Sequence, residues 1–181
     1  GLLPFAKHID ENFPIFIDAK SGVSGAGKKC NESTHYISIN ENIFAYKALN
    51  HRHEPEIKEK LLKFSNKEFD VNFVPHLIPA TRGELIDAYM LLNEDIEPLE
   101  VLQEFYKDEP FVTVFDQPVD IKSCSGTNFC DIYAQKKGNK LYVNSAVDNI
   151  LRGSSSQAVA NANLMCGLEE NTALPTIAYV P

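Results

Sequence analysis

Apolar residues recur along most of the chain at the spacing of β-strands. Residues 15–17 alternate too little for a half-exposed strand, so the pattern predicts a strand buried on both sides. Residues 33–39 place apolar side chains on a two-residue period and also predict a strand. Further strands are predicted at residues 43–48 and 111–115, and as a hairpin of residues 131–134 and 140–143 turning at residues 137–139.

Two stretches are less decided. Residues 71–79 contain Pro75 and Pro79, which predicts a broken strand at a sheet edge or a bulge, since proline cannot donate to a strand ladder. Residues 84–92 fit a strand or a helix by pattern alone.

Helical spacing is clear in three places. Pro55 is predicted as the first residue of one helix and Pro98 as the first of another, because proline suits that position. A third helix is predicted from Ser154 to a stop at Gly167, with Ala158, Val159, Ala162 and Met165 on one side. Many strands with few helices, in no regular alternation, predict an α+β fold with a mixed or antiparallel sheet and flanking helices.

Composition narrows the class of protein. A chain of 181 residues that is 44% hydrophobic can bury the core of one domain. Its net charge of -8 argues against nucleic acid or an anionic membrane surface as a partner. The four cysteines form no CxxC pair, so no metal site is assigned and a reduced, cytoplasmic location is expected. No signal peptide is recognised.

Residues 50–57, Asn-His-Arg-His-Glu-Pro-Glu-Ile, hold the densest chemistry. His51 and His53 flank Arg52 just before a helix start, so a proton carrier and an anion clamp share one turn. Arg52, Arg82 and Arg152 are the only arginines and are the first candidates for binding carboxylate or phosphate. An ordinary histidine-rich surface loop could have the same sequence, so this pattern alone leaves open whether the turn is a functional site or such a loop.

Residues 18–27 hold three glycines and two serines directly after a predicted strand. Such a loop lets backbone amides approach an anion closely. The spacing is neither a P-loop nor a GxGxxG fingerprint, and an ordinary glycine turn stays equally open.

Four motifs in one order resemble N-acetyl-gamma-glutamyl-phosphate reductase. They are Lys-Ser-Gly-Val-Ser-Gly-Ala-Gly-Lys at residues 20–28, the His-Arg-His turn, residues 75–83, and residues 147–165. Aspartate-semialdehyde dehydrogenase is a relative that shares a similar glycine loop, but the His-Arg-His turn favours the arginine-pathway enzyme.

The resemblance implies a glyceraldehyde-3-phosphate-dehydrogenase-like C-terminal domain. Residues 1–147 would form the substrate-binding and dimerisation domain, and residues 148–181 a helix and tail that pack on a Rossmann domain of the same protein. In the family that domain ends in a Gly-Cys-Tyr-Pro-Thr motif carrying the nucleophile, which this chain lacks; the chain alone is therefore expected to be inactive. The implied partners are NADP, an acyl-phosphate substrate and a second copy, in a dimer or tetramer.

The resemblance also assigns roles to residues. His51 matches the active-site histidine, with His53 as the alternative base. The substrate-binding residues implied are Arg52, His53, Arg82 and Ser21, and the cofactor-binding residues are Gly22, Ser24, Gly25 and Asn149.

Purely structural roles are also possible for several of these residues. His53 could cap or orient its neighbours, Asn149 could cap the entry to a helix, and Arg152 could serve a structural ion pair. Two other functions also stay open: a semialdehyde dehydrogenase acting on a related aspartate- or lysine-pathway acyl phosphate, and an interaction domain without chemistry.

Overall fold

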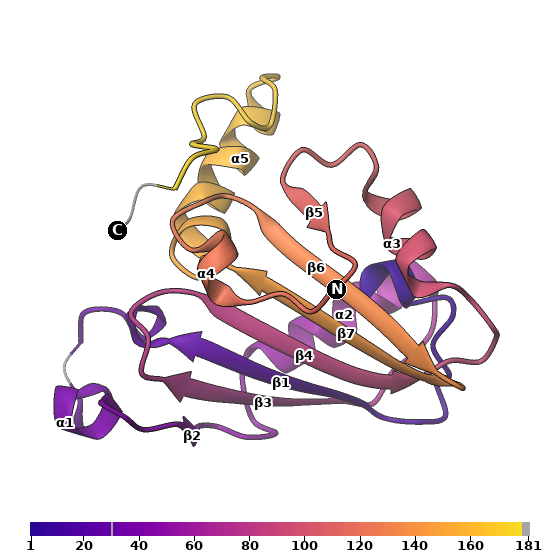
Figure 1. Cartoon of the computed structure of the whole chain (residues 1–181), viewed down its shortest axis with the longest axis horizontal. Helices are drawn as coiled ribbons and strands as arrows, with labels where there is room; N and C mark the ends of the chain where they lie inside the picture. The colour runs from indigo at the N-terminus through magenta and orange to yellow at the C-terminus, as the bar shows by residue number, and fades with distance from the viewer. Residues whose placement is uncertain (30, 179–181) are drawn as a thin grey trace.

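A computed structural model describes residues 1–29 and 31–178. A mixed seven-stranded sheet with the order β2-β3-β1-β4-β7-β6-β5 forms its centre (Figure 1). β1 pairs in parallel with β3, and β5 with β6, while the other neighbours are antiparallel. The strands are β1 (Ile15–Gly22), β2 (Phe44–Ala45), β3 (Val71–Ile78), β4 (Glu84–Leu91), β5 (Val112–Val114), β6 (Cys130–Lys137) and β7 (Lys140–Val147).

Helices cover one face of this sheet, which confirms the predicted α+β class. A 3-10 turn at Leu3–Phe5 packs there between α2 and α3; α2 lies on β3, and α3 lies on β5 and β6. The helices are α1 (Tyr36–Ile39), α2 (His53–Ser65), α3 (Pro98–Tyr106), α4 (Ile121–Cys124) and α5 (Ser156–Met165), with shorter turns at Val23–Ala26, Glu32–Thr34 and Leu151–Ser155.

The core lies between the helices and the sheet. Alternate residues of β1, Ile15 and Ile17 among them, point inward and meet Leu61 of α2. Leu102 of α3 and Phe5 are fully buried in the same cluster. Each such side chain contributes about 1.5–3 kcal/mol by leaving water. The core therefore holds the N-terminal end of α2 against the sheet, and with it the His-Arg-His turn.

The opposite face of the sheet is open. Phe16 of β1 is 52% exposed and Tyr89 of β4 is 50% exposed. The prediction that residues 15–17 are buried on both sides is therefore wrong, because no helix of the described residues covers Phe16 and Tyr89. On this face α4 packs instead on β6 and β7. Polar side chains run between the aromatic ones: Lys20 Nζ lies 2.6 Å from Asp87 Oδ2 and 3.2 Å from Asp18 Oδ2.

The predicted strand at residues 33–39 is also wrong. The segment forms the turn Glu32–Thr34 and then α1. Asn31 begins the turn, because its side-chain Oδ1 accepts a hydrogen bond from the Thr34 N–H at 3.0 Å. Ile37 is 80% exposed. Of the apolar residues in this segment only Ile39 is buried, so the alternation does not mark one buried face.

The loop predicted at residues 18–27 begins later than expected. β1 continues to Gly22, since Ala19 and Ser21 extend the inward alternation and the strand bonds to neighbours on both sides. The 3-10 turn Val23–Ala26 follows.

The predicted break in β3 does not occur. The strand runs unbroken through Pro75, whose carbonyl accepts from the Tyr46 N–H at 2.9 Å. The side of Pro75 that lacks an N–H faces the sheet margin, where β2 pairs only with Leu77 and His76. β3 is the second strand of the sheet, paired with β1 in continuous register and with the two-residue β2, so the predicted break and the predicted edge position or bulge are wrong.

Most other predicted elements are confirmed. Residues 84–91 form a strand, α3 begins at Pro98, and β6 and β7 form the predicted hairpin. The helix predicted from Pro55 begins instead at His53, which places Pro55 inside the first turn, where its missing N–H costs nothing.

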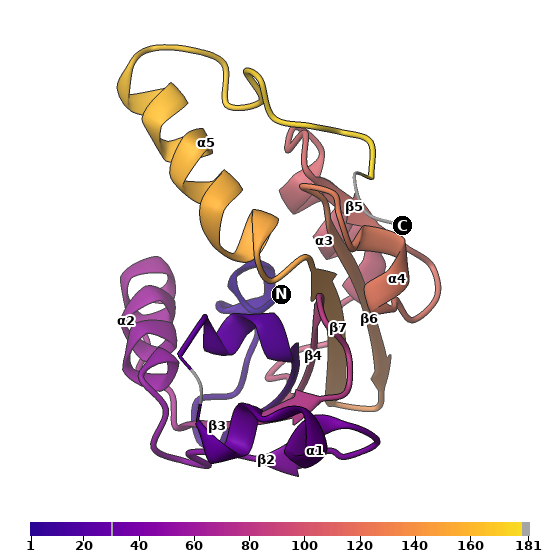
Figure 2. The ribbon, with the colours of Figure 1, turned by 90° about the vertical axis from the view of Figure 1, so that its left-hand side faces the viewer.

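Helix α5 rises beyond the end of the sheet (Figures 1 and 2). Ala160 packs with Phe111 and Leu174 in a small second cluster. The apolar side predicted for this helix is exposed, with Val159 at 44% and Met165 at 87%. Within the described residues, no helix combines the length and apolar character that crossing a membrane requires.

Candidate functional site

A cavity of about 520 Å³ lies where the ends of β1 and β3 meet the start of α2. Its wall also includes the first residue of β4 and the segment that follows β7. Gly22, Ser24 and Arg82 lie outside its lining. Six of the predicted site residues line it: Ser21, Gly25, His51, Arg52, His53 and Asn149.

His51 and His53 are in direct contact. The backbone N–H of His53 donates to Nδ1 of His51 at 3.3 Å, and the ring centroids lie 4.5 Å apart with an interplanar angle of 82°. The ring of Phe73 packs against His51 with a centroid distance of 5.3 Å. A neutral imidazole whose Nδ1 accepts carries its proton on Nε2. The proton of a neutral His51 therefore lies on Nε2, and His51 lines the cavity.

Both imidazoles favour the neutral form. Burial lowers the pKa of His51, and the nearby His53, Arg52 and Lys47 lower it further. Burial and Arg52 lower the pKa of His53, and Glu56 partly opposes them. At neutral pH a neutral imidazole of this pair can accept a proton from a reacting group, because it does not first have to release one of its own as a cation.

The turn before the histidines is strained. Lys47 and Leu49 have φ angles of 46° and 55°, a region that side-chain-bearing residues seldom adopt. Tyr46 packs edge-on against His51 with ring centroids 5.7 Å apart. Sequence reasoning missed Tyr46 and Lys47 as site residues, because it predicted only a short extended piece here.

Free positive charge gathers at one side of the cavity. Arg52 and Lys47 line it and form no ion pair with any residue that the structure describes. The arginine at position 152 is committed elsewhere: its Nη1 and Nη2 each lie 3.1 Å from Glu170 Oε1. Arg152 also lies over the ring of Phe111 at 5.1 Å, so its structural role is supported.

Arg82 forms a buried ion pair with Asp148. Its Nε lies 3.0 Å from Oδ2 of Asp148, and Nη2 donates to Oδ1 at 3.1 Å. Burial opposes ionisation of Asp148, but N–H groups of Gly126, Leu151 and Ile150, together with Arg82, lower its pKa. To bind substrate, Arg82 would have to use guanidinium N–H groups that do not contact Asp148. This role stays a prediction.

The amide of Asn149 fastens the glycine loop to β4. Its Oδ1 accepts from the Gly83 N–H at 2.8 Å, and its Nδ2 donates to Ser24 Oγ at 3.1 Å and to the Gly22 carbonyl at 3.4 Å. Glycine is needed at position 22 for the loop to lie this close to residue 82, because a Cβ there would stand 3.0 Å from the Arg82 backbone. Asn149 thus has structural partners already, and its contact with a cofactor stays a prediction.

The backbone amides of the glycine loop are partly used within the protein. The N–H groups of Val23 and Ser24 donate to the carbonyls of Ala80 and Thr81 at 2.9 and 3.2 Å. Gly25 lines the cavity, and a Cβ there would stand 3.1 Å from Ser21 Oγ and 3.3 Å from Asn149 Nδ2. The missing side chain of Gly25 therefore leaves room for a ligand beside Asn149.

The described cysteines lie away from this chemistry. Burial raises the pKa of the Cys124 thiol to about 12 and also raises that of Cys130. Neither lines the cavity, and Cys166 is exposed on the far segment. Cys30 lies outside the described residues. That the nucleophile is none of these thiols stays a prediction.

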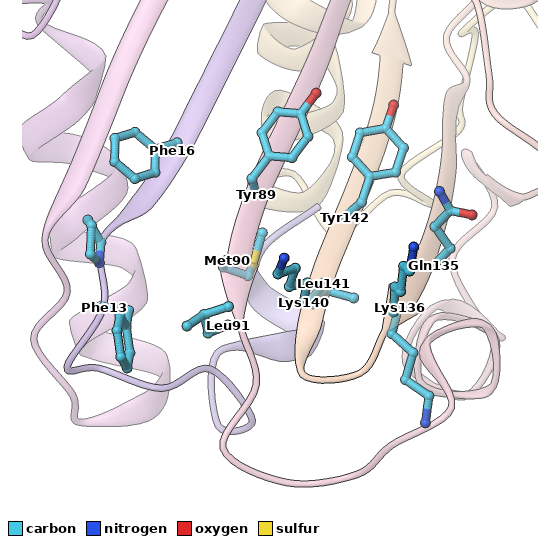
Figure 3. Close-up of a pocket in the computed structure, with 12 residues that line it drawn as sticks. Phe13, Phe16, Tyr89, Met90, Leu91, Gln135, Lys136, Lys140, Leu141 and Tyr142 are labelled. Carbon is cyan, nitrogen blue, oxygen red and sulfur yellow. The ribbon is translucent and has the colours of Figure 1, made fainter.

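A larger cavity, of about 620 Å³, lies on the open face of the sheet, away from the histidines. Figure 3 shows the rings of Phe16, Tyr89 and Tyr142 projecting from three adjacent strands, with Phe13 below them. Lys136, Lys137 and Lys140 bound it at the hairpin end. Because it is mainly apolar and shallow against a bare sheet, it has the character of a contact surface.

A family model described as the semialdehyde dehydrogenase dimerisation domain matches residues 1–149. The chain belongs to this semialdehyde dehydrogenase family. It is 60% identical to the N-acetyl-gamma-glutamyl-phosphate reductase of Sulfurovum sp. (strain NBC37-1) and 55% identical to that of Wolinella succinogenes. Each match covers 100% of this chain and 54% of the relative. The chain thus spans about half the length of the curated relatives it matches.

Solved structures give the same fold. Aspartate semialdehyde dehydrogenase II of Vibrio cholerae, complexed with ASA, matches with a TM-score of 0.71 at 15% identity, covering 92% of this chain and 58% of that chain. The aspartate semialdehyde dehydrogenase of Francisella tularensis matches with a TM-score of 0.67 at 14% identity, and the match covers 91% of this chain and 61% of that chain. These semialdehyde dehydrogenases confirm the predicted fold class, and the named relatives confirm the resemblance drawn from the four motifs.

Proposed function

We propose that this semialdehyde dehydrogenase chain is the substrate-binding and dimerisation part of an NADP-dependent reductase. The complete enzyme would reduce N-acetyl-gamma-glutamyl phosphate to N-acetyl-glutamate semialdehyde in arginine biosynthesis, in the cytoplasm. The observation that carries the proposal is one cavity in which two neutral imidazoles, Arg52, Lys47 and Gly25 converge. The names of the relatives support the choice of substrate.

The reaction needs a thiolate from outside this chain. That thiolate would displace phosphate from the acyl carbon and form a thioester, which takes a hydride and collapses to the aldehyde, regenerating the thiolate. His51 is placed for the proton movements. Its Nε2–H can hydrogen-bond to the carbonyl oxygen as negative charge develops there, a kind of stabilisation that often contributes most to catalysis. To accept a proton at Nε2, His51 must first move its own proton to Nδ1 and give up the bond from His53.

Substrate anions would meet the cations of the turn. Arg52 suits the phosphate or the carboxylate, because its guanidinium is exposed and unpaired within the described residues. Lys47 would add a second positive charge on the same side. His53, Ser21 and Arg82 are proposed as further substrate contacts.

The cofactor fits beside Gly25. When bound, NADPH, the reduced form of NADP, would supply the hydride. The room left by the absent Gly25 side chain suits the nicotinamide end, with Asn149 and the Ser24 hydroxyl next to it. Gly22 would contribute by holding the loop close to Arg82.

The two parts of the chain would serve different contacts. In residues 1–147, the open sheet face with Phe16 and Tyr89 would pack on a second copy in a dimer or tetramer. In residues 148–181, the exposed side of α5 would pack on a Rossmann domain of the same protein.

The test is substrate competition in the complete enzyme. We expect N-acetyl-gamma-glutamyl phosphate to exceed aspartyl phosphate by more than about 100-fold in kcat/KM, since a site built around one substrate's polar groups rejects analogues strongly. NADPH should be preferred over NADH, and this chain alone should turn over neither substrate. An equal or reversed preference between the acyl phosphates would reject the assigned substrate.

A further inference from the structure

Glu84 occupies a position that the strand pattern assigns to an apolar residue. It is the first residue of β4, and the residues two, four and six places further along on the same face are Ile86, Ala88 and Met90. These three pack in or against the core under α2. A carboxyl group at the head of this row costs desolvation energy that an apolar side chain would not. Departures of this kind concentrate at functional sites.

Nothing in the described part of the chain pairs with Glu84. Its side chain takes part in no ion pair and no hydrogen bond there. Two more deeply buried carboxyls nearby are partnered: Asp87 binds Lys20 and Asp148 binds Arg82. Burial raises the pKa of Glu84. The carboxyl of Glu84 is therefore a half-buried acceptor with no protein partner in the described part of the chain.

Glu84 faces the histidine cavity and a smaller one beside it. It lines both the cavity of about 520 Å³ and an adjacent one of about 360 Å³, as His53 and Phe73 also do. Tyr46 packs against His51 and also lies near Glu84. Burial raises the pKa of the Tyr46 hydroxyl most, and the charge of Glu84 raises it further. A ligand held by the two histidines would thus extend past Phe73 toward Glu84.

We infer that Glu84 is a specificity-determining residue that accepts a hydrogen bond from the nitrogen-bound hydrogen of the substrate. This rests on the proposed function. An acylated amino-acid acyl phosphate carries two anionic groups and one amide N–H. The anionic groups are complementary to Arg52 and Lys47, and the N–H is the group that an isolated carboxyl can bind. The carboxyl of Glu84 offers an oxygen as acceptor in either protonation state.

The test compares two substrates in the complete enzyme. N-acetyl-gamma-glutamyl phosphate carries the N–H, and glutaryl phosphate has the same carbon chain without it. We expect Glu84→Leu to lower kcat/KM for the N-acetyl substrate by about 10- to 100-fold and for glutaryl phosphate by less than about 3-fold, because only one of them loses a buried hydrogen bond. Glu84→Gln, which keeps a carbonyl acceptor, should lose less than Glu84→Leu. Glu59→Gln, on the exposed side of α2, should change neither.

The variants also separate this inference from a folding defect. Because residue 84 heads an apolar row, Glu84→Leu should keep or raise the melting temperature while it loses the preference for the N-acetyl substrate. Equal losses on both substrates, or no loss on either, would overturn the inference.

The two proposals fail in different ways. A wild-type enzyme that turns over no N-acetylated acyl phosphate would contradict the proposed function. The inference is then judged by thermal shifts with N-acetylglutamate and glutarate. A wild-type preference for N-acetylglutamate that disappears in Glu84→Leu would support it, and an unchanged preference would overturn it.

Discussion

The backbone N–H of His53 donates to Nδ1 of His51 across 3.3 Å, and this contact sets where the proton of His51 lies. It places the proton of a neutral His51 on Nε2, and protonation of Nδ1 would set two N–H groups against each other. The sequence order His-Arg-His before a helix start thus builds a donor whose charged form is disfavoured. Arg52, between the two, adds a positive charge that acts in the same direction.

The first prediction concerns the titration of His51. In the folded chain it should titrate below its ordinary value of 6.5, because burial, His53 and Arg52 disfavour the cation. Since the folded pKa lies below the unfolded one, the stability linked to His51 is complete above pH 6.5 and is lost as the pH falls through the folded value.

NMR titration of the imidazole protons checks this. Arg52→Gln should move the pKa of His51 upward, while the exposed His35 should not respond to this change. A His51 that titrates at or above 6.5 would contradict the environment described for it.

The second prediction concerns the pair of Arg82 and Asp148. Asp148→Ala removes the acceptor of three backbone N–H groups and leaves Arg82 without its partner. Breaking a buried pair in this way should cost about 3–5 kcal/mol of unfolding free energy. Urea denaturation of the isolated chain measures it. Asp95→Ala is the control, because that side chain is 91% exposed and its removal should have little effect.

The third prediction concerns Gly83. Its φ of 98° strains any other residue, and a Cβ would stand 2.7 Å from Cβ of Ile121. Gly83→Ala should cost about 2 kcal/mol or more, combining an unfavourable φ with overpacking. Gly138→Ala shares a positive φ of 62° but meets nothing within 4 Å, so it should cost only about 1 kcal/mol. Equal melting temperatures for the two variants would count against the close packing at Gly83.

The fourth prediction concerns the exposed side of α5. In the isolated chain, Met165→Lys should change the unfolding free energy by less than about 0.5 kcal/mol, because the side chain is in water. In the complete enzyme the same change should lower stability clearly, since the helix is proposed to pack on the Rossmann domain. Ser154→Lys, on an exposed residue ahead of α5, is the control. Amide hydrogen exchange of α5 should be fast in the isolated chain and slow in the complete enzyme.

Sequence patterns predicted the elements whose local signals agree with their packing. The β6–β7 hairpin combines alternation with a Lys-Gly-Asn turn, and Gly138 there takes the positive φ that the turn needs. α3 begins at Pro98 as its spacing requires. Residues 33–39 have the alternation of a strand, but Tyr36 and Ile37 are exposed and only Ile39 is buried, so local capping by Asn31 outweighs the pattern.

The site was predictable only where its residues form a motif. The His-Arg-His turn and the glycine loop carry recognisable spacing, and the structure brings them into one cavity. Lys47 and Glu84 belong to no motif, and only folding brings them there. The one available signal for Glu84 was a charged residue in the apolar row of a strand, and it was masked because residues 84–92 also fitted a helix.

The central claim, that His51 moves the proton in the reaction of the complete enzyme, is tested most directly by His51→Asn. Asparagine can still accept from the His53 N–H but cannot transfer a proton, so kcat should fall by about 10²- to 10⁴-fold while NADPH binding changes little. In His53→Asn, kcat should fall by a smaller factor than in His51→Asn. Retention of kcat within a few-fold by His51→Asn, together with its loss in His53→Asn, would contradict the account.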